Sequence, residues 1–186
     1  MIVLSGAELV LPDRILTPGT LVLDGDRIVE IRQGTHPGAG VFQGHYIVPG
    51  FIDVHVHGAD GVDTLGDGDA VAALAAALPK YGVTGFCPTT VACGPGGLRR
   101  VLQQVREARA APRPRSSRVL PAHLESNFIN PEFKGAQPAT CLRNPRAALT
   151  GQEDRAGGAG ETGGEEFEAV EILSEIERAA PDVGST

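Results

Sequence analysis

Tryptophan is absent from this 186-residue sequence, and aromatic residues make up only 4% of it. Hydrophobic residues still reach 41%, so the chain is apolar enough and long enough to bury a core. Basic residues are too few to balance the acidic ones, and the net charge of −7 argues against nucleic acid and anionic membranes as partners. No window approaches roughly 18 uninterrupted apolar residues, so we expect no membrane-spanning segment.

Cysteine is also scarce. The sequence has no Cys-x-x-Cys pair, and any disulfide would leave one cysteine unmatched among Cys87, Cys93 and Cys141. This usage is typical of reduced thiols, and we expect a cytoplasmic protein. The first residues have no basic segment followed by a long apolar one, so we expect no signal peptide.

Residues 1–48 are rich in short β-forming runs. Asp24-Gly25-Asp26 has the composition of a tight turn, which favours a hairpin between the runs on either side of it. We predict a small β-sandwich-like domain over residues 1–48. Its predicted strands are Ile2–Leu4, Glu8–Leu11, Gly19–Leu23 and Arg27–Ile31.

From residue 49 the pattern alternates between strand and helix. Apolar residues recur at helical spacing in two segments, first at Val71, Leu74, Ala75 and Leu78 and then at Leu98, Val101, Leu102 and Val105. Repeated β-α-β units imply an α/β fold with a parallel sheet. The predicted strands are 49–57, 82–90 and 118–125, followed by an irregular loop at 126–146, a glycine-rich linker at 157–164, a helix at 165–180 and the start of a fourth strand at 181–184.

The segment PGFIDVHVHG, residues 49–58, carries the clearest chemical pattern. Asp53, His55 and His57 alternate with apolar residues, so they share one face of an extended strand. Two imidazoles on one face can converge on a metal ion, and a nearby carboxylate can orient them. The alternative is a half-buried strand with two solvated histidines. Gly58 stands where the strand would open into a loop.

His123 and Glu125 repeat the same spacing on the third predicted strand. Both pairs lie at the C-terminal ends of their strands, where barrel enzymes gather their functional groups. A Glu carboxylate beside two imidazoles is a reasonable ligand set for zinc or another divalent metal. The alternative for Glu125 is a solvated charge at a strand end.

Several motifs resemble known proteins. PGFIDVHVHG resembles the opening strand of the amidohydrolase superfamily. HLE at 123–125, followed by FINPEFKGA at 128–136, resembles the N-acetylglucosamine-6-phosphate deacetylase family, whose usual sequence at this motif is HLEGPFI…KGAH. VTGFCPTT at 83–90 and IERAAPDVG at 176–184 extend the resemblance over nearly the whole chain.

The resemblance implies a metal-dependent hydrolase that removes acetate from N-acetylglucosamine 6-phosphate, an amino-sugar phosphate. It also implies a partial TIM-type (β/α) barrel of about three to four βα units over residues 49–186, after the small β-domain, and a homodimer. By motif match His55, His57 and Glu125 would bind a divalent metal ion, zinc or similar. Asp53 and His123 would support these ligands, and Ala136 and Gln137 would contact substrate.

The sequence departs from the family at three points. Ser126-Asn127 replaces Gly-Pro after the Glu, and Gln137 replaces a His that helps hold the sugar; an amide can hydrogen-bond but cannot carry a charge. The family takes two further His ligands and an acid/base Asp from later strands, whereas no histidine follows His123. A complete barrel takes roughly 250 residues, so we expect an N-terminal part of the enzyme, with the acid/base Asp beyond it, inactive alone.

Two other interpretations remain open. Another amidohydrolase, of the aminoacylase or dihydroorotase type, fits the first motif but not the HLE block. A non-catalytic remnant that binds metal weakly, or that pairs with a partner chain, fits the missing ligands. Outside these motifs, Cys87 is expected in the core. A group of arginines is expected on the solvated face of a helix, namely Arg99, Arg100, Arg106 and Arg109.

Overall fold

The computed structural model describes residues 1–125, 127–146 and 167–184. The chain forms two compact units, Met1–Gly50 and Phe51–Thr186. The boundary between them along the chain lies two residues beyond the predicted one. The linker predicted at 157–164 lies outside the described residues. In the part of the chain that the structure describes, no helix is long and apolar enough to cross a membrane.

The first unit is a single five-stranded sheet. Three long strands pair antiparallel in the order β3-β2-β1, and two short strands pair parallel with β1. The sandwich-like packing predicted for this region stays a prediction. The strands are β1 (Ile2–Val10), β2 (Ile15–Asp24), β3 (Arg27–Gln33), β4 (Gly40–Val41) and β5 (Tyr46–Ile47).

The predicted hairpin is confirmed, because Asp24 pairs with Arg27 across Gly25, which has a positive φ of 58°. The two separate strands predicted within residues 2–11 are wrong, since β1 is continuous there. A register shift between Ser5 and Ala7 lets the pairing with β2 continue past Gly6. Thr20 of β2 is buried, and its Oγ1 donates to the Gly34 carbonyl at 2.7 Å, which stabilises the sheet.

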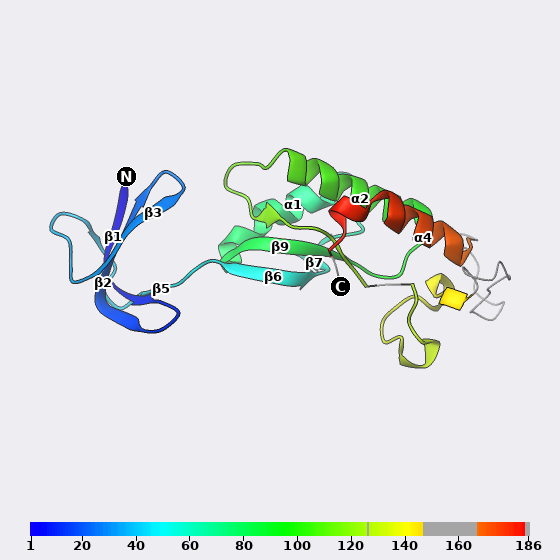
Figure 1. The fold of residues 1–186 in the computed structure, drawn as a ribbon, viewed down its shortest axis with the longest axis horizontal. Coiled ribbons are helices and arrows are strands. Elements are labelled where there is room, and N and C mark those ends of the chain that lie inside the picture. Colours follow the sequence, from blue (N-terminus) through cyan, green and yellow to red (C-terminus); the bar gives the residue numbers. More distant parts are fainter. Residues whose placement is uncertain (126, 147–166, 185–186) are drawn as a thin grey trace. The chain divides into compact units, whose positions relative to one another are not determined.

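The second unit is built on a parallel sheet with β9 at its centre. β6 pairs with one edge of β9, and the two short strands β10 and β11 pair with the other. Figure 1 shows α1 and α2 on the same side of β6 and β9. The predicted α/β class is therefore confirmed, while the partial barrel stays a prediction. The strands are β6 (Phe51–Val56), β7 (Gly58–Ala59), β8 (Val62–Asp63), β9 (Val83–Thr90), β10 (Arg118–Val119) and β11 (His123–Leu124).

The first two predicted helices form on their apolar stripes, and the third forms over Ala169–Arg178, within the predicted 165–180. Pro95 occupies the first position of α2, where its fixed φ suits a helix start. The buried stripes of α1 and α2 pack with Phe86 of β9, which is fully buried, in one core cluster. The helices are α1 (Ala70–Ala77), α2 (Pro95–Ala110) and α4 (Ala169–Arg178), with 3₁₀ turns at Leu78–Tyr81, Pro131–Phe133, Ala139–Cys141 and Ala180–Asp182.

The predicted strands of this unit differ from the observed ones in two places. Pro121 interrupts the third strand, because proline has no N–H to donate, and divides it into β10 and β11. Ile52 and Val54 are exposed although they were expected on an apolar face. Among the described residues β6 pairs only with β9, so it forms an edge of the sheet.

The arginines of α2 are not simply a solvated face. Arg99 pairs with the buried carboxylate of Glu175 on α4, while Arg106 and Arg109 both pair with the buried carboxylate of Asp182. The backbone carbonyl of Asp182 accepts from Ala122 N at 2.7 Å. These contacts fix the segment after α4 beside the third strand, where Val183 forms a single parallel bridge to Ala122 at the predicted start of a fourth strand.

We predict that this anchoring makes the stability of the chain sensitive to acid. Hydrogen bonding by Arg99 holds the pKa of Glu175 below its ordinary value, against the effect of burial. The unfolded chain therefore binds more protons than the folded one, and unfolding free energy is lost as pH falls from the ordinary value towards the lowered pKa. Urea unfolding at a series of acidic pH values measures the unfolding free energy at each pH. This free energy should fall less steeply with falling pH in the Glu175→Gln variant than in the parent chain. An identical pH dependence in the two chains would contradict the prediction.

Candidate metal centre

The two motif pairs meet because β9 holds their strands side by side. Val56 of β6 is in register with Pro88 of β9, and His123 of β11 is in register with Thr89. All three strands run parallel, so their C-terminal ends lie at the same edge of the sheet. His57 follows the last residue of β6, and Glu125 follows the last residue of β11. Residues that are 68 positions apart in sequence thus become neighbours.

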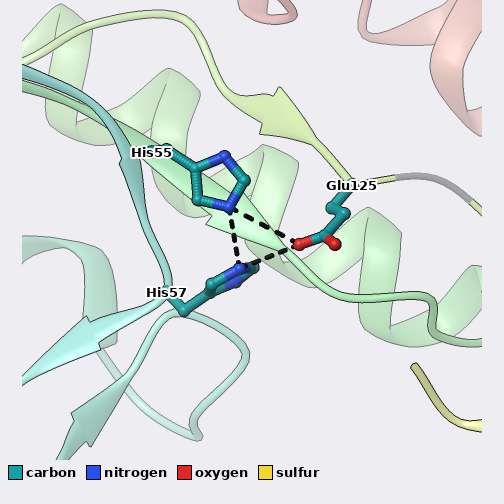
Figure 2. Close-up of side chains that lie close together, drawn as sticks. All are labelled: His55, His57 and Glu125. Atoms are coloured by element: carbon teal, nitrogen blue, oxygen red, sulfur yellow. Dashed lines mark hydrogen bonds and ion pairs between the residues drawn. The ribbon is translucent and has the colours of Figure 1, made fainter. Parts of the chain in front are cut away.

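Three side chains converge at this edge, as Figure 2 shows. Nε2 of His55 lies 3.0 Å from Nε2 of His57. A single oxygen, Oε2 of Glu125, lies 2.9 Å from Nε2 of His57 and 3.5 Å from Nε2 of His55. Among the described residues, these three form the group of His, Cys, Asp and Glu side chains that could hold a metal ion.

The donor set and its spacing fit a divalent metal. Zinc binds His nitrogen and carboxylate oxygen at about 2.0–2.2 Å, which places tetrahedral ligand atoms roughly 3.3 Å apart. The three observed separations lie on both sides of that value. Each side chain is partly exposed, so solvent can reach the site. Two histidines, one glutamate and an accessible position are the ligand arrangement of a catalytic rather than a structural zinc site.

Asp53 and His123 lie beside this group in different ways. Asp53 Oδ1 accepts from the backbone N–H of His55 at 3.1 Å, so it holds the main chain of this predicted ligand and not its imidazole. The ring of His123 packs against the ring of His55, with centroids 4.7 Å apart and planes at 66°. Their predicted supporting role stays a prediction, and the contacts give each of them a means to restrain His55.

Gly58 does not open a loop, as the sequence suggested, but begins the short hairpin β7–β8. It pairs with Asp63, and a Cβ atom built on it would lie 2.4 Å from the Val62 carbonyl oxygen. Glycine is required there because the second hairpin strand passes against the backbone. The hairpin also holds the adjacent His57, a predicted ligand, since Thr64 N donates to the His57 carbonyl at 2.7 Å.

The two residues matched to substrate binding lie in different environments. Ala136 is exposed, whereas Gln137 is buried and its Oε1 accepts from Ala92 N at 2.6 Å. The Gln137 side chain therefore ties the loop that follows Glu125 to the end of β9. Substrate contact by these residues stays a prediction.

Asn127 has a structural role that the sequence did not suggest. It is buried, and its Nδ2 donates to the carbonyls of Cys93 and Cys141, both at 2.7 Å. Ser126, the other member of that departure, lies outside the described residues. The signal available in the sequence was the replacement of Gly-Pro by Ser126-Asn127 after Glu125. A sequence does not reveal which carbonyls the Asn127 amide contacts.

Cys87 lies in β9 and is only partly buried. Burial raises the pKa of its thiol, and the charge of Asp53 raises it further. A raised pKa keeps the sulfur protonated and poorly nucleophilic at neutral pH. The prediction of Cys87 as a core residue is wrong, because the residue is only partly buried and lies outside the core cluster formed by the described residues.

Known proteins of similar sequence are deacetylases of amino-sugar phosphates. No family model matches the chain. The N-acetylglucosamine-6-phosphate deacetylase of Rattus norvegicus is 36% identical over 135 residues, which are 70% of this chain and 31% of that protein. Over that span the chain is similar in sequence to the N-acetylglucosamine-6-phosphate deacetylases. It spans about a third of the length of the mammalian relatives it matches.

Solved deacetylase structures share the fold. The crystal structure of the Thermotoga maritima N-acetylglucosamine-6-phosphate deacetylase is 27% identical, with a TM-score of 0.65 over 77% of this chain and 37% of that one. The Mycobacterium smegmatis enzyme, solved in complex with N-acetyl-D-glucosamine-6-phosphate, has a TM-score of 0.67 over 98% of this chain and 42% of that one. At 22% identity, that second likeness shows the fold alone.

Proposed function

We propose that the protein carrying this chain is a divalent-metal hydrolase that deacetylates N-acetylglucosamine 6-phosphate. The observation that supports this most directly is the convergence of His55, His57 and Glu125 on one point at the C-terminal edge of the sheet. The sequence relatives bear the name of this activity. We further propose that the metal is zinc or a similar ion, that residues 49–186 form part of a (β/α) barrel, and that the protein is a cytoplasmic homodimer.

In this proposal the chain's own residues hold and orient the metal. His55 and His57 contribute Nε2 atoms, and Glu125 contributes Oε2 and a negative charge that offsets part of the charge of the cation. A bound divalent metal supplies a water of lowered pKa and polarises the acetamide carbonyl. Asp53 restrains the backbone at His55, and His123 packs against the His55 ring. The loop fixed by Asn127 and Gln137 leads away from Glu125 and is the part of the chain matched to substrate contact.

The chain alone offers an incomplete set of groups for this reaction. Amide hydrolysis needs an acid/base group that takes a proton from water and delivers it to the leaving amine, a step worth about 10²–10⁴-fold. No histidine follows His123 in the sequence. Among the described residues after Glu125, the carboxylates lie in the loop, on α4 or, as in Asp182, paired with arginines of α2. We therefore propose that the 186-residue chain alone does not release acetate.

A chimera tests this proposal. The chain would replace the matched N-terminal part of the Thermotoga maritima deacetylase, which supplies the remaining strands. We expect the chimera to release acetate from N-acetylglucosamine 6-phosphate, its His57→Ala variant to lose that activity, and the isolated chain with added zinc to match a metal-only blank. A folded, metal-loaded chimera without turnover would contradict the function. Turnover by the isolated chain that disappears in His55→Ala would contradict its inactivity.

A second candidate is a non-catalytic protein that binds a metal or pairs with a partner chain. The absence of any histidine after His123 favours it for this chain taken alone. Metal content measured beside acetate release separates the two candidates. Stoichiometric metal with an inactive chimera would favour the non-catalytic protein.

A further inference from the structure

The peptide groups that link His55 to His57 are not held by a regular strand ladder. The pairing of β6 with β9 has a register shift between Asp53 and Val56, so it is irregular where the two histidines project. A strand edge without its ladder leaves backbone N–H and C=O groups that need other partners when buried. Val56, between the two histidines, is buried.

Two buried threonine hydroxyls supply those partners. The Val56 N–H donates to Oγ1 of Thr89 at 2.9 Å, and that hydroxyl in turn donates to the Cys87 carbonyl at 3.0 Å. On the other side, Oγ1 of Thr64 donates to the Val56 carbonyl at 3.1 Å. One hydroxyl therefore holds the peptide that joins His55 to Val56, and the other holds the peptide that joins Val56 to His57.

Both threonines connect the Val56 peptide groups to the other elements that form the site. Thr89 belongs to β9 and is in register with His123 of β11, the strand that leads to Glu125. Thr64 follows the hairpin β7–β8, and its backbone N–H also donates to the His57 carbonyl. Their side chains are at most 1% exposed, so neither hydroxyl exchanges its partner for water.

We propose that Thr64 and Thr89 are positioning residues that set the separation of the His55 and His57 imidazoles for metal binding. The inference rests on the proposed metal centre. A metal site tolerates displacements of only about 0.5 Å in its ligands. Valine has nearly the shape of threonine but places a methyl group where the hydroxyl was. A methyl group at 2.9 Å from the Val56 nitrogen cannot accept its hydrogen bond, so the Val56 peptide would be displaced.

The test is cobalt binding to the purified 186-residue chain, read by the visible absorption of the bound ion and by its dissociation constant. We expect Thr89→Val and Thr64→Val each to weaken cobalt binding by about 10–100-fold, the usual cost of losing a group that orients a metal ligand, and to alter the spectrum. Thr89→Ser keeps the hydroxyl and should bind as the parent does. Thr20→Val, which loses a buried hydroxyl in the first unit, is the matched control and should leave affinity and spectrum unchanged.

The outcomes separate the inference from the function on which it rests. If the parent chain binds no cobalt, the metal centre is wrong. If the parent binds cobalt and both valine variants bind it within twofold with an unchanged spectrum, the positioning role is wrong. If Thr89→Val does not fold, Thr64→Val and Thr89→Ser decide, and a loss of affinity in Thr89→Ser would also overturn the inference.

Discussion

The His57→Ala variant is expected to lose most of the bound divalent metal. Nε2 of His57 is the atom nearest to both other donors of the group, 3.0 Å from the His55 nitrogen and 2.9 Å from the Glu125 oxygen. Without the His57 imidazole only two donors of the group remain, Nε2 of His55 and Oε2 of Glu125, which are 3.5 Å apart. The affinity loss should exceed the roughly 10–100-fold that follows from losing a group that only supports a ligand. Metal content after dialysis and the zinc dissociation constant measure it.

The companion variants make this prediction specific. His55→Ala should lose metal similarly, and Glu125→Gln should as well, because a neutral amide is a poorer ligand than a carboxylate for a divalent cation. His45→Ala removes an exposed histidine of the first unit and should leave metal content unchanged. Equal metal stoichiometry in all three site variants would show that this group does not bind the ion.

The largest effect on stability is expected for Phe86→Ala. The Phe86 side chain is 0% exposed and lies in β9, the strand that pairs with β6 and with β11, which leads to Glu125. Truncation of a buried phenylalanine removes its transfer free energy and leaves a cavity that neighbours fill only partly, at a cost of about 3–5 kcal/mol. Urea unfolding should show a lower midpoint with little change in slope.

Phe133→Ala serves as the control for this effect. Phe133 is 78% exposed in the loop after Glu125, so its truncation should change the unfolding free energy by no more than about 0.5 kcal/mol. If the two variants had equal midpoints, β9 would not be the centre of the core. A soluble Phe86→Ala chain should also bind metal less well, since β9 sets the distance between β6 and β11.

Much of the second unit could be predicted from residue pattern. Spacing of two residues placed His55 and His57 on one strand face, and apolar residues at helical spacing predicted α1 and α2. Alternation of strands with helices predicted parallel neighbours, which brought Glu125 to the same edge as the histidines. These features depend on local periodicity, which the sequence contains directly.

Residue pattern was less informative about side chains whose contact partners are distant in the sequence. Arg99, Arg106 and Arg109 have the spacing of a solvated helix face, and only the packing of α4 and the segment after it shows that they neutralise buried carboxylates. Gln137 and Asn127 were weighed as departures from a motif, whereas their amides join the loop to backbone groups near the start of α2 and, for Asn127, to the carbonyl of Cys141.

The sequence by itself determined which residue types reach the edge of the sheet: two imidazoles and a carboxylate at strand ends. Only the tertiary structure decided their separations, because these depend on the register of β9 against β6 and β11. It also decided the hydroxyl contacts of Thr64 and Thr89 with Val56. Periodicity specifies the face on which a side chain lies, whereas the distance between two faces is set by hydrogen bonds and packing between segments that are distant in sequence.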